Sequence, residues 1–142
     1  MIAIRRAGEA DLELMRRLWD AFSAEATYAP YPPSGFDAGL LRDHVALVAE
    51  EGGQPVGTVY ANLASPHFGY VFGLYTRPEA RGRGVGRELM RAVAGVLRAQ
   101  GREWVLLSVD TPNETARAFY ERLGFEDASR MLRARVDRLL GD

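Results

Sequence analysis

The chain has 142 residues, of which 47% are hydrophobic and 26% are charged, and its formal net charge at pH 7 is −1. This length fits one domain with one core, so we predict a single domain over residues 1–142. The near-zero charge argues against binding to nucleic acid or to an anionic membrane surface, and no apolar run approaches the ~20 residues of a membrane span. The absence of cysteine excludes a disulfide scaffold, a thiolate metal site and an acyl-cysteine mechanism. Since the amino terminus lacks the apolar core of a signal peptide, we expect a cytoplasmic protein.

The first quarter of the chain predicts a strand, a long helix and an irregular loop. Apolar residues alternate over residues 2–5 and then recur at three- and four-residue steps from about residue 9 to residue 26, where an amphipathic helix is expected. Residues 28–35 contain three prolines and a glycine, which prevent regular structure. Tyr28 and Tyr31 in this loop either belong to a surface connector or line a binding pocket.

The next segment predicts an antiparallel meander. After a short helix near residues 36–45, three strands are expected at residues 46–50, 56–62 and 70–76, and polar turns separate them. His67 lies in the second turn. Such a histidine is usually a surface residue, and a catalytic role is the alternative.

The meander leads into a glycine-rich segment that runs from Leu74 to Arg87. A proline ends the strand, three glycines alternate, and an amphipathic helix begins directly afterwards. Glycine permits positive φ and close approach of a ligand, and the first turn of a helix offers free N–H groups and the positive end of the helix dipole. The segment therefore predicts a phosphate cradle, to which Arg81, Arg83 and Arg87 add positive charge.

The glycine spacing selects among the known phosphate loops. Gly86 is followed by Arg87 and Glu88, not by the Lys-Ser/Thr of a Walker loop, and the third glycine comes one position too early for a Rossmann fingerprint. The pattern R-x-x-G-x-G from Arg81 to Gly86 resembles the acetyl-coenzyme A (acetyl-CoA) pyrophosphate loop of the GNAT superfamily of N-acetyltransferases.

The last third of the chain predicts a parallel crossover followed by edge strands. A helix over residues 85–101 leads to the nearly continuous apolar run 104–109, which is typical of a central strand covered on both faces. Strand, helix and strand form a right-handed βαβ unit. A further helix is expected over residues 114–123, and residues 131–136 should return as one or two edge strands.

A second motif supports the resemblance to the GNAT superfamily. The segment from Asn113 to Phe125 is similar to its signature N-x-x-A-x-x-F/Y-Y-x-x-x-G-F, in the order and spacing that the family uses. Each motif alone also fits an ordinary turn or a short capped helix. The resemblance is strong over residues 70–125, and it implies an α/β (α+β) single-domain fold. In that fold a mixed, bent sheet of six to seven strands is flanked by about four helices.

The resemblance also implies an activity and a set of roles. The expected reaction is acetyl transfer from acetyl-CoA, as co-substrate, to a primary amine of a small molecule or peptide, by direct attack in a ternary complex. The strand before the glycine loop should carry a bulge that separates it from its parallel neighbour. Tyr120 would be the general acid for the leaving thiolate. The residues expected to bind the co-substrate are Leu74, Tyr75, Thr76, Arg81, Gly82, Arg83, Gly84, Val85, Gly86, Arg87, Asn113 and Tyr120; no metal is expected.

The sequence departs from the family pattern at the general base. Some relatives carry a glutamate where this chain has Ser108, and the polyamine-acetylating branch has a Glu-Asp pair where this chain has Phe72-Gly73. A distant carboxylate, His67 or a water chain remains open as the base.

The acceptor is predicted only as a class. Aromatic residues suggest an apolar acceptor site, and the meander shows no obvious acidic residues for a polyamine, which favours a small amine, an amino acid or a peptide amine. The alternatives are an acyl-CoA sensor and a partner-binding module, both without turnover. Dimers are common in the family, so a homodimer is expected without a predicted interface. The aromatic residues in question are Tyr28, Tyr31, Phe68, Tyr70 and Phe72.

Overall fold

The computed structural model describes residues 1–26 and 34–141. They form two compact units, Met1–Asp110 and Thr111–Asp142, which are considered separately below. Tyr28 and Tyr31 lie outside the described residues, so their predicted loop is not characterised. The single-domain organisation stays a prediction.

The first unit is built on a sheet whose strand order follows the sequence. Neighbouring strands are antiparallel, except for the last pair, which is parallel. The predicted meander and the parallel crossover are therefore confirmed. The strands are β1 (Ile2–Arg6), β2 (Val45–Glu51), β3 (Gln54–Asn62), β4 (Phe68–Thr76) and β5 (Trp104–Leu106).

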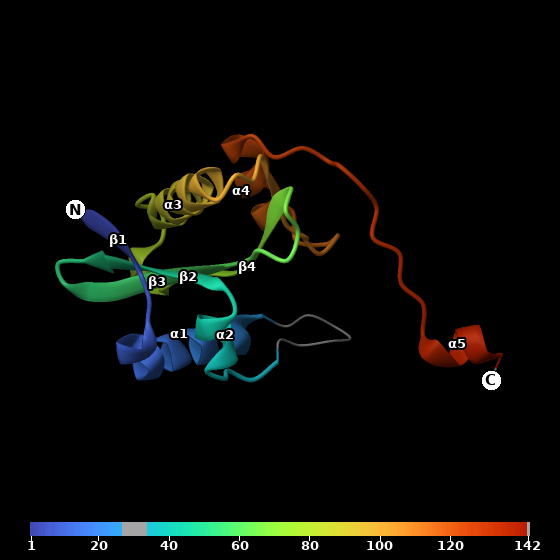
Figure 1. Ribbon diagram of the computed structural model, residues 1–142, viewed down its shortest axis with the longest axis horizontal. Helices are drawn as coiled ribbons and strands as arrows, with labels where there is room; N and C mark the ends of the chain where they lie inside the picture. Colours follow the sequence, from blue (N-terminus) through green and yellow to red (C-terminus); the bar gives the residue numbers. More distant parts are fainter. Residues whose placement is uncertain (27–33, 142) are drawn as a thin grey trace. The chain divides into compact units, whose positions relative to one another are not determined.

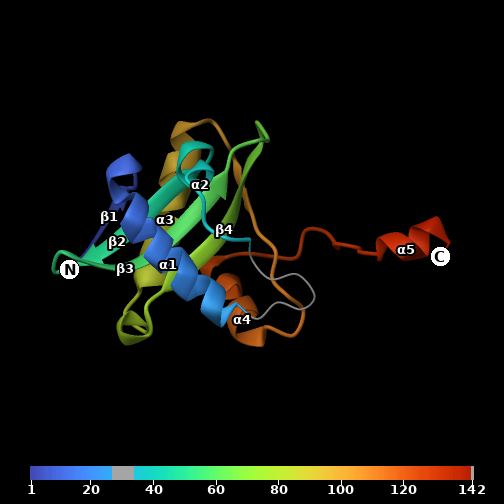
Figure 2. The ribbon, with the colours of Figure 1, turned by 90° about the horizontal axis from the view of Figure 1, so that it is seen from below.

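Helices cover both faces of this sheet (Figure 1). The 3-10 turn η1 (Glu9–Asp11), α1 (Leu12–Glu25) and α2 (Gly39–Arg42) lie on one face, and α3 (Val85–Ala99) lies on the other. Figure 2 shows α1 crossing the strands obliquely on its face. Within the described ranges, no helix is long and apolar enough to cross a membrane.

Glycines in the sheet allow α3 to pack closely. A Cβ on Gly57 would lie 3.1 Å from a methyl carbon of Val85 and 3.2 Å from one of Leu89, and a Cβ on Gly69 would lie 2.4 Å from a methyl carbon of Leu97. The buried side chains of α3 recur at three- and four-residue steps, as its sequence predicts. They are Val85, Leu89, Met90, Val93 and Leu97.

The second unit contains α4 (Glu114–Leu123) and α5 (Val136–Leu140). Asn113 caps α4, because its side-chain oxygen accepts a hydrogen bond from the N–H of Ala116 at 3.2 Å. Gly124 ends the helix in the left-handed conformation, with φ of 104°. The predicted boundaries of this helix are confirmed.

The sheet differs from the sequence prediction in size. It has five strands rather than six to seven, and five α-helices occur in the described residues rather than about four. β5 has three residues and lies at the edge of the sheet, and its Trp104 is 60% exposed. The prediction of a central strand covered on both faces was therefore wrong, because an apolar run shows what a strand can bury but not whether a neighbour pairs with it.

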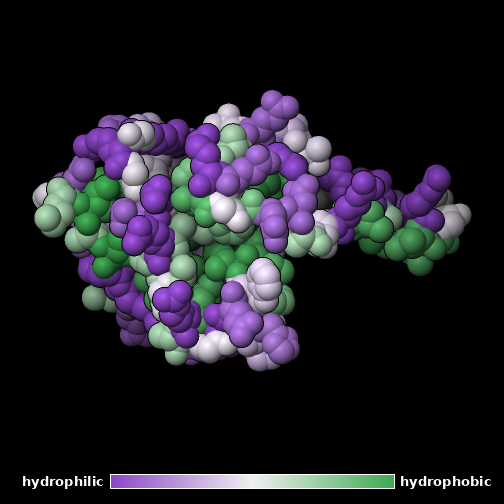
Figure 3. All heavy atoms as spheres, turned by 90° about the horizontal axis from the view of Figure 1, so that it is seen from above, coloured by the Kyte–Doolittle hydropathy of each residue, from purple (hydrophilic) through white to green (hydrophobic). Residues whose placement is uncertain are grey.

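Residues 131–136 do not form the predicted edge strands. Met131 and Leu132 are 74% and 87% exposed, and a helix begins at Val136. Leu132, Ala134 and Val136 alternate with Arg133 and Arg135, as in a strand with one apolar face, whereas Val136, Leu139 and Leu140 have the spacing of a helix, which is the structure that residues 136–140 adopt. Figure 3 shows hydrophobic atoms at the surface of α5.

Candidate functional site

β4 and β5 separate part of the way along β4. Among the described residues they pair from Phe68–Trp104 to Tyr70–Leu106, whereas β4 continues to Thr76. The edge of β4 beyond Tyr70 therefore faces no strand on its β5 side within the part of the chain that the structure describes. We call this opening the fork.

A β-bulge lies on β4 next to the fork. Thr58 pairs with Tyr75 and Tyr60 pairs with Phe72, so β4 has one more residue than β3 over this interval. Gly73 lies within it and has a positive φ of 65°. Because a bulge increases local twist and redirects backbone groups, it explains why β4 leaves its parallel neighbour. The predicted bulge is confirmed.

The glycine-rich loop joins β4 to α3 through the 3-10 turn η2 (Pro78–Ala80). Gly82 and Gly84 have positive φ values of 79° and 85°, and a Cβ on either would meet no protein atom within 4 Å. The first helical hydrogen bond of α3 runs from the N–H of Glu88 to the carbonyl of Gly84, so the three preceding N–H groups have no acceptor within the helix. Open space, free amides and the positive helix end suit a phosphate group.

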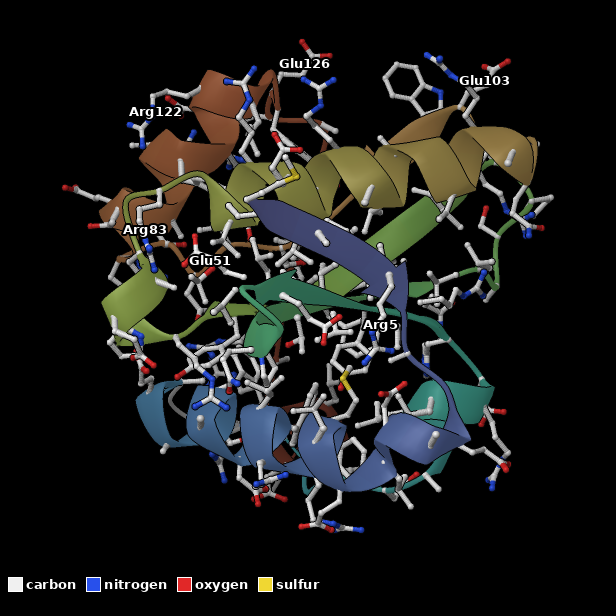
Figure 4. All side chains as sticks on the ribbon, turned by 90° about the vertical axis from the view of Figure 1, so that its left-hand side faces the viewer. Arg5, Glu51, Arg83, Glu103, Arg122 and Glu126 are labelled. Carbon is white, nitrogen blue, oxygen red and sulfur yellow. The ribbon has the colours of Figure 1, made fainter. Side chains whose placement is uncertain are left out.

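Carboxylates already bind two of the three arginines of this loop. Arg81 contacts Glu25 at 2.6 Å, and Arg83 contacts Glu51 at 2.8 Å. Figure 4 shows Arg83 and Glu51 pointing toward one another. Arg87 is exposed and forms no ion pair with the other described residues. The side chains therefore add less positive charge than the sequence suggests, and the backbone amides are the part of the loop best suited to an anion.

Arg81 also binds the end of β4. Its Nε donates to the carbonyl oxygen of Thr76 at 2.9 Å, and its guanidinium lies over the ring of Tyr75 at 5.8 Å. Tyr75 is 7% exposed, and burial, together with the neighbouring Glu25, raises the pKa of its phenol. Tyr75 therefore stays protonated at neutral pH. Arg81 thus joins the loop to the strand residues at the fork.

Four polar side chains form a row on the α1 face of the sheet. Asn62 and Tyr70 are partners on β3 and β4, and the Asn62 Nδ2 lies 3.3 Å from the Nε2 of His44, just before β2. At the other end, the Tyr70 hydroxyl donates to the Oγ of Ser108 at 2.8 Å, just beyond β5. We call His44, Asn62, Tyr70 and Ser108 the polar row. It ends where the fork begins.

The sequence did not identify His44 and Asn62. They are 18 residues apart and meet only because the meander places them in the same row. The amide orientation of Asn62 is set by the N–H of Ala64, which donates to its Oδ1 at 2.8 Å. Its Nδ2 therefore faces His44 as the donor. The register of the β2–β3 hairpin, in which Val45 pairs with Ala61, was the signal that would have found this pair.

Phe72 packs with aromatic side chains of the core. Its ring stacks on Tyr60 at 5.4 Å and meets Trp19 and His44 edge-on at 6.3 and 5.0 Å. Burial raises the pKa of Tyr60, whose hydroxyl has no hydrogen-bond partner among the described residues. Phe72 therefore contacts the polar row at His44, and its packing with core aromatic rings explains its presence without a ligand.

His67 lies just before β4, at the end of the strand that is farther from the glycine loop. It precedes the first residue of β4, whereas the glycine loop follows the last, about 30 Å away along an extended strand of nine residues. Its carbonyl accepts hydrogen bonds from Glu103 and Trp104. His67 is therefore far from the glycine loop but only three residues from Tyr70, where the fork begins, and its catalytic role stays an alternative.

Tyr120 lies in the second unit, between two aromatic rings. The ring centroids of Phe119 and Phe125 are 5.1 and 5.5 Å from its own. Its carbonyl accepts the N–H of Phe125 at 3.0 Å, next to the glycine that ends α4. Tyr120 is half-buried, as the apolar spacing of this helix predicts.

Comparisons with known proteins agree with these features. The model of the "Acetyltransferase (GNAT) family" matches residues 12–125. A predicted acetyltransferase from Clostridium acetobutylicum, solved with acetyl-CoA, is 20% identical with a TM-score of 0.77, and the match covers 97% of this chain and 98% of that one. A ribosomal-protein-alanine N-acetyltransferase from Brucella melitensis is 22% identical with a TM-score of 0.79, covering 94% and 98%. The aminoglycoside N-acetyltransferase AAC(6')-Iy, with CoA, is 21% identical with a TM-score of 0.78, covering 95% and 94%.

Proposed function

Because the chain belongs to the GNAT family of acetyltransferases, we propose that it transfers the acetyl group of acetyl-CoA to a primary amine of a small molecule or peptide. The family uses acetyl-CoA as its co-substrate. One observation carries the proposal: the anion cradle, with its positive-φ glycines, follows the unpaired edge of β4 after only a short segment that contains η2. Acetyl-CoA carries its thioester on a long arm that ends in a pyrophosphate, so its binding needs an anion cradle and an open strand edge next to one another.

The residues at the cradle and the fork would hold acetyl-CoA through their backbone. The amides from Gly82 to Arg87 would bind its pyrophosphate, because they are free and the helix dipole favours negative charge there. The unpaired edge at Leu74, Tyr75 and Thr76 offers backbone donors and acceptors to the pantetheine arm and the thioester carbonyl. Asn113 is proposed to contact the same arm from the start of α4.

The chemistry requires three proton movements. The acceptor amine attacks as a free base, so an ammonium first gives up a proton; the C–N bond then forms and the C–S bond breaks. The amine loses a second proton after attack, and the thiolate that leaves takes one up. We assign to Tyr120 the donation of a proton to the leaving thiolate. We assign the removal of the amine protons to solvent water, since no protein base is identified at the fork among the described residues.

A panel of primary amines tests the proposal. Isothermal titration should show binding of acetyl-CoA, and thiol release should show transfer to at least one amine, with the acetylated product identified by mass spectrometry. Binding without transfer to any amine would favour the acyl-CoA sensor. The absence of binding would remove the family activity from this chain and favour a partner-binding module.

A further inference from the structure

The polar row ends at the fork in two hydroxyl groups. Tyr70 is half-buried and donates to Ser108, which is exposed and lies just beyond the last residue that pairs β5 with β4. Ser108 has one lone pair and its own hydroxyl hydrogen left for a ligand. The fork therefore carries an uncharged hydrogen-bonding group where some relatives place a carboxylate.

We propose that the Tyr70–Ser108 pair binds the acceptor as a neutral amine, so that the protein prefers weakly basic amines, such as the α-amine of an amino acid or peptide. The inference rests on the proposed function and adds the acceptor class to it. Ser108 contacts the amine, and Tyr70 is a positioning residue that holds the Ser108 hydroxyl toward the fork. A serine hydroxyl gives an ammonium no counter-charge, and it cannot take up the ammonium's proton at neutral pH.

The size of this preference follows from the fraction of each amine that is neutral. At pH 7.5 about a quarter of an α-amine is neutral, against about 0.1% of an alkylamine such as the lysine ε-amine. This difference favours the α-amine by about 10²-fold when the protein binds only the neutral form. The more basic amine is the better nucleophile, which offsets part of the difference, so we expect a preference of about tenfold or more.

Few ionisable groups reach this pair from the elements of the first unit. Tyr70 is itself a member, His44 lies at the far end of the polar row, and Asp110 follows Ser108 by two residues. The polar row contains no carboxylate. Asp110 is the acidic side chain nearest to Ser108 along the chain, so it provides the control for a missed base.

The test compares kcat/KM at pH 7.5 for the α-amine of a dipeptide and for the ε-amine of Nα-acetyl-lysine. The wild type should favour the dipeptide about tenfold or more. Ser108→Glu should reduce this preference by about tenfold, because a carboxylate stabilises the ammonium and accepts its proton, and it should add an acidic limb to the pH profile that does not depend on the amine. Ser108→Gln introduces a side chain of the same shape as glutamate but without its charge. It should change neither the preference for the dipeptide nor the shape of the pH profile.

Tyr70→Phe tests the positioning role. It keeps the ring but loses the hydrogen bond to Ser108, so kcat/KM for both amines should fall about tenfold while the Kd for acetyl-CoA stays unchanged. Asp110→Asn should leave the preference as it is.

Each contrary result has one meaning. Four results would overturn the inference and leave acetyl transfer intact. The wild type could favour the ε-amine, or Asp110→Asn could lose the preference. Glu and Gln at position 108 could have equal effects, or Tyr70→Phe could be fully active. A wild-type protein that binds acetyl-CoA and acetylates neither probe nor any amine of the panel overturns both.

Discussion

The two halves of the candidate site are built in opposite ways. The cradle consists of consecutive residues, Gly82 to Arg87, and it presents backbone amides. The acceptor side consists of the polar row, whose four members come from four separate segments and present side chains. One half therefore depends on local conformation, and the other depends on the register of the sheet.

This difference decides how each half responds to substitution. A backbone site tolerates many side chains but fails when a residue cannot adopt positive φ or when a Cβ fills the space for the ligand. A side-chain site keeps its shape when one member changes, and it changes its selectivity instead. The predictions below test that contrast, beginning with the largest effect.

Gly84→Val should abolish binding of acetyl-CoA. Gly84 has a φ of 85°, which a β-branched residue adopts only with strain, and the new side chain would occupy space that is open in front of the helix amides. The strain is about 1–3 kcal/mol, so the protein should still fold. Isothermal titration measures the loss, and thermal unfolding checks the fold.

Gly101→Val is the matched control for this prediction. Gly101 has a similar φ of 77° and equally open surroundings, but it follows the other end of α3. It should lower stability by a similar amount and leave the affinity for acetyl-CoA unchanged. If Gly84→Val binds acetyl-CoA like the wild type, the cradle lies elsewhere.

Tyr120→Phe should lower turnover by ~10²- to 10⁴-fold, the usual contribution of general acid catalysis. The ring contacts with Phe119 and Phe125 remain, so the fold of α4 and the affinity for acetyl-CoA should change little. Steady-state kinetics and titration separate the two effects. An undiminished kcat would remove Tyr120 from the proton path. Tyr70→Phe, which also deletes one hydroxyl, should have the smaller effect described above.

The same contrast explains what the sequence could predict. The glycine turn before α3 was predicted, and Gly82 and Gly84 have positive φ, because turn chemistry and helix starts depend on neighbouring residues; its role as a phosphate cradle stays a prediction. The meander and the parallel crossover were also predicted, because alternation and the apolar stripe of α3 are local patterns. The bulge at Gly73 followed from the family resemblance, and the register shift confirms it.

Local sequence patterns do not predict which residues distant in the chain come into contact. His44 meets Asn62 through the register of β2 and β3, and the carboxylates that bind Arg81 and Arg83 come from α1 and β2. The size of the sheet was wrong for the same reason. The sequence shows an apolar run at residues 104–109 and a strand-like alternation at residues 132–136, but neither local pattern shows whether the two segments pair.

The rate should rise about tenfold for each pH unit below the pKa of the amine, because solvent water removes the amine proton in our proposal. The midpoint should move with the pKa of the amine when the substrate is changed. Profiles of kcat/KM for two amines of different pKa measure this. An acidic limb at one fixed pH for both amines would reveal a protein base.

The smallest effect is expected from Glu51→Gln, which breaks the ion pair with Arg83 in the glycine loop. The two groups are 2.8 Å apart, with side chains 26% and 49% exposed, so the pair contributes about 1 kcal/mol or less to the free energy of unfolding. The substitution removes a negative charge near the cradle and frees Arg83 for the phosphates, so binding of acetyl-CoA should tighten by up to about threefold at low salt. Salt should suppress this gain, because the groups are partly exposed.

Titration of acetyl-CoA at two ionic strengths measures this gain in affinity, with chemical denaturation as the check on stability. A change in affinity above about tenfold would show that the cradle depends on its side chains as much as on its backbone.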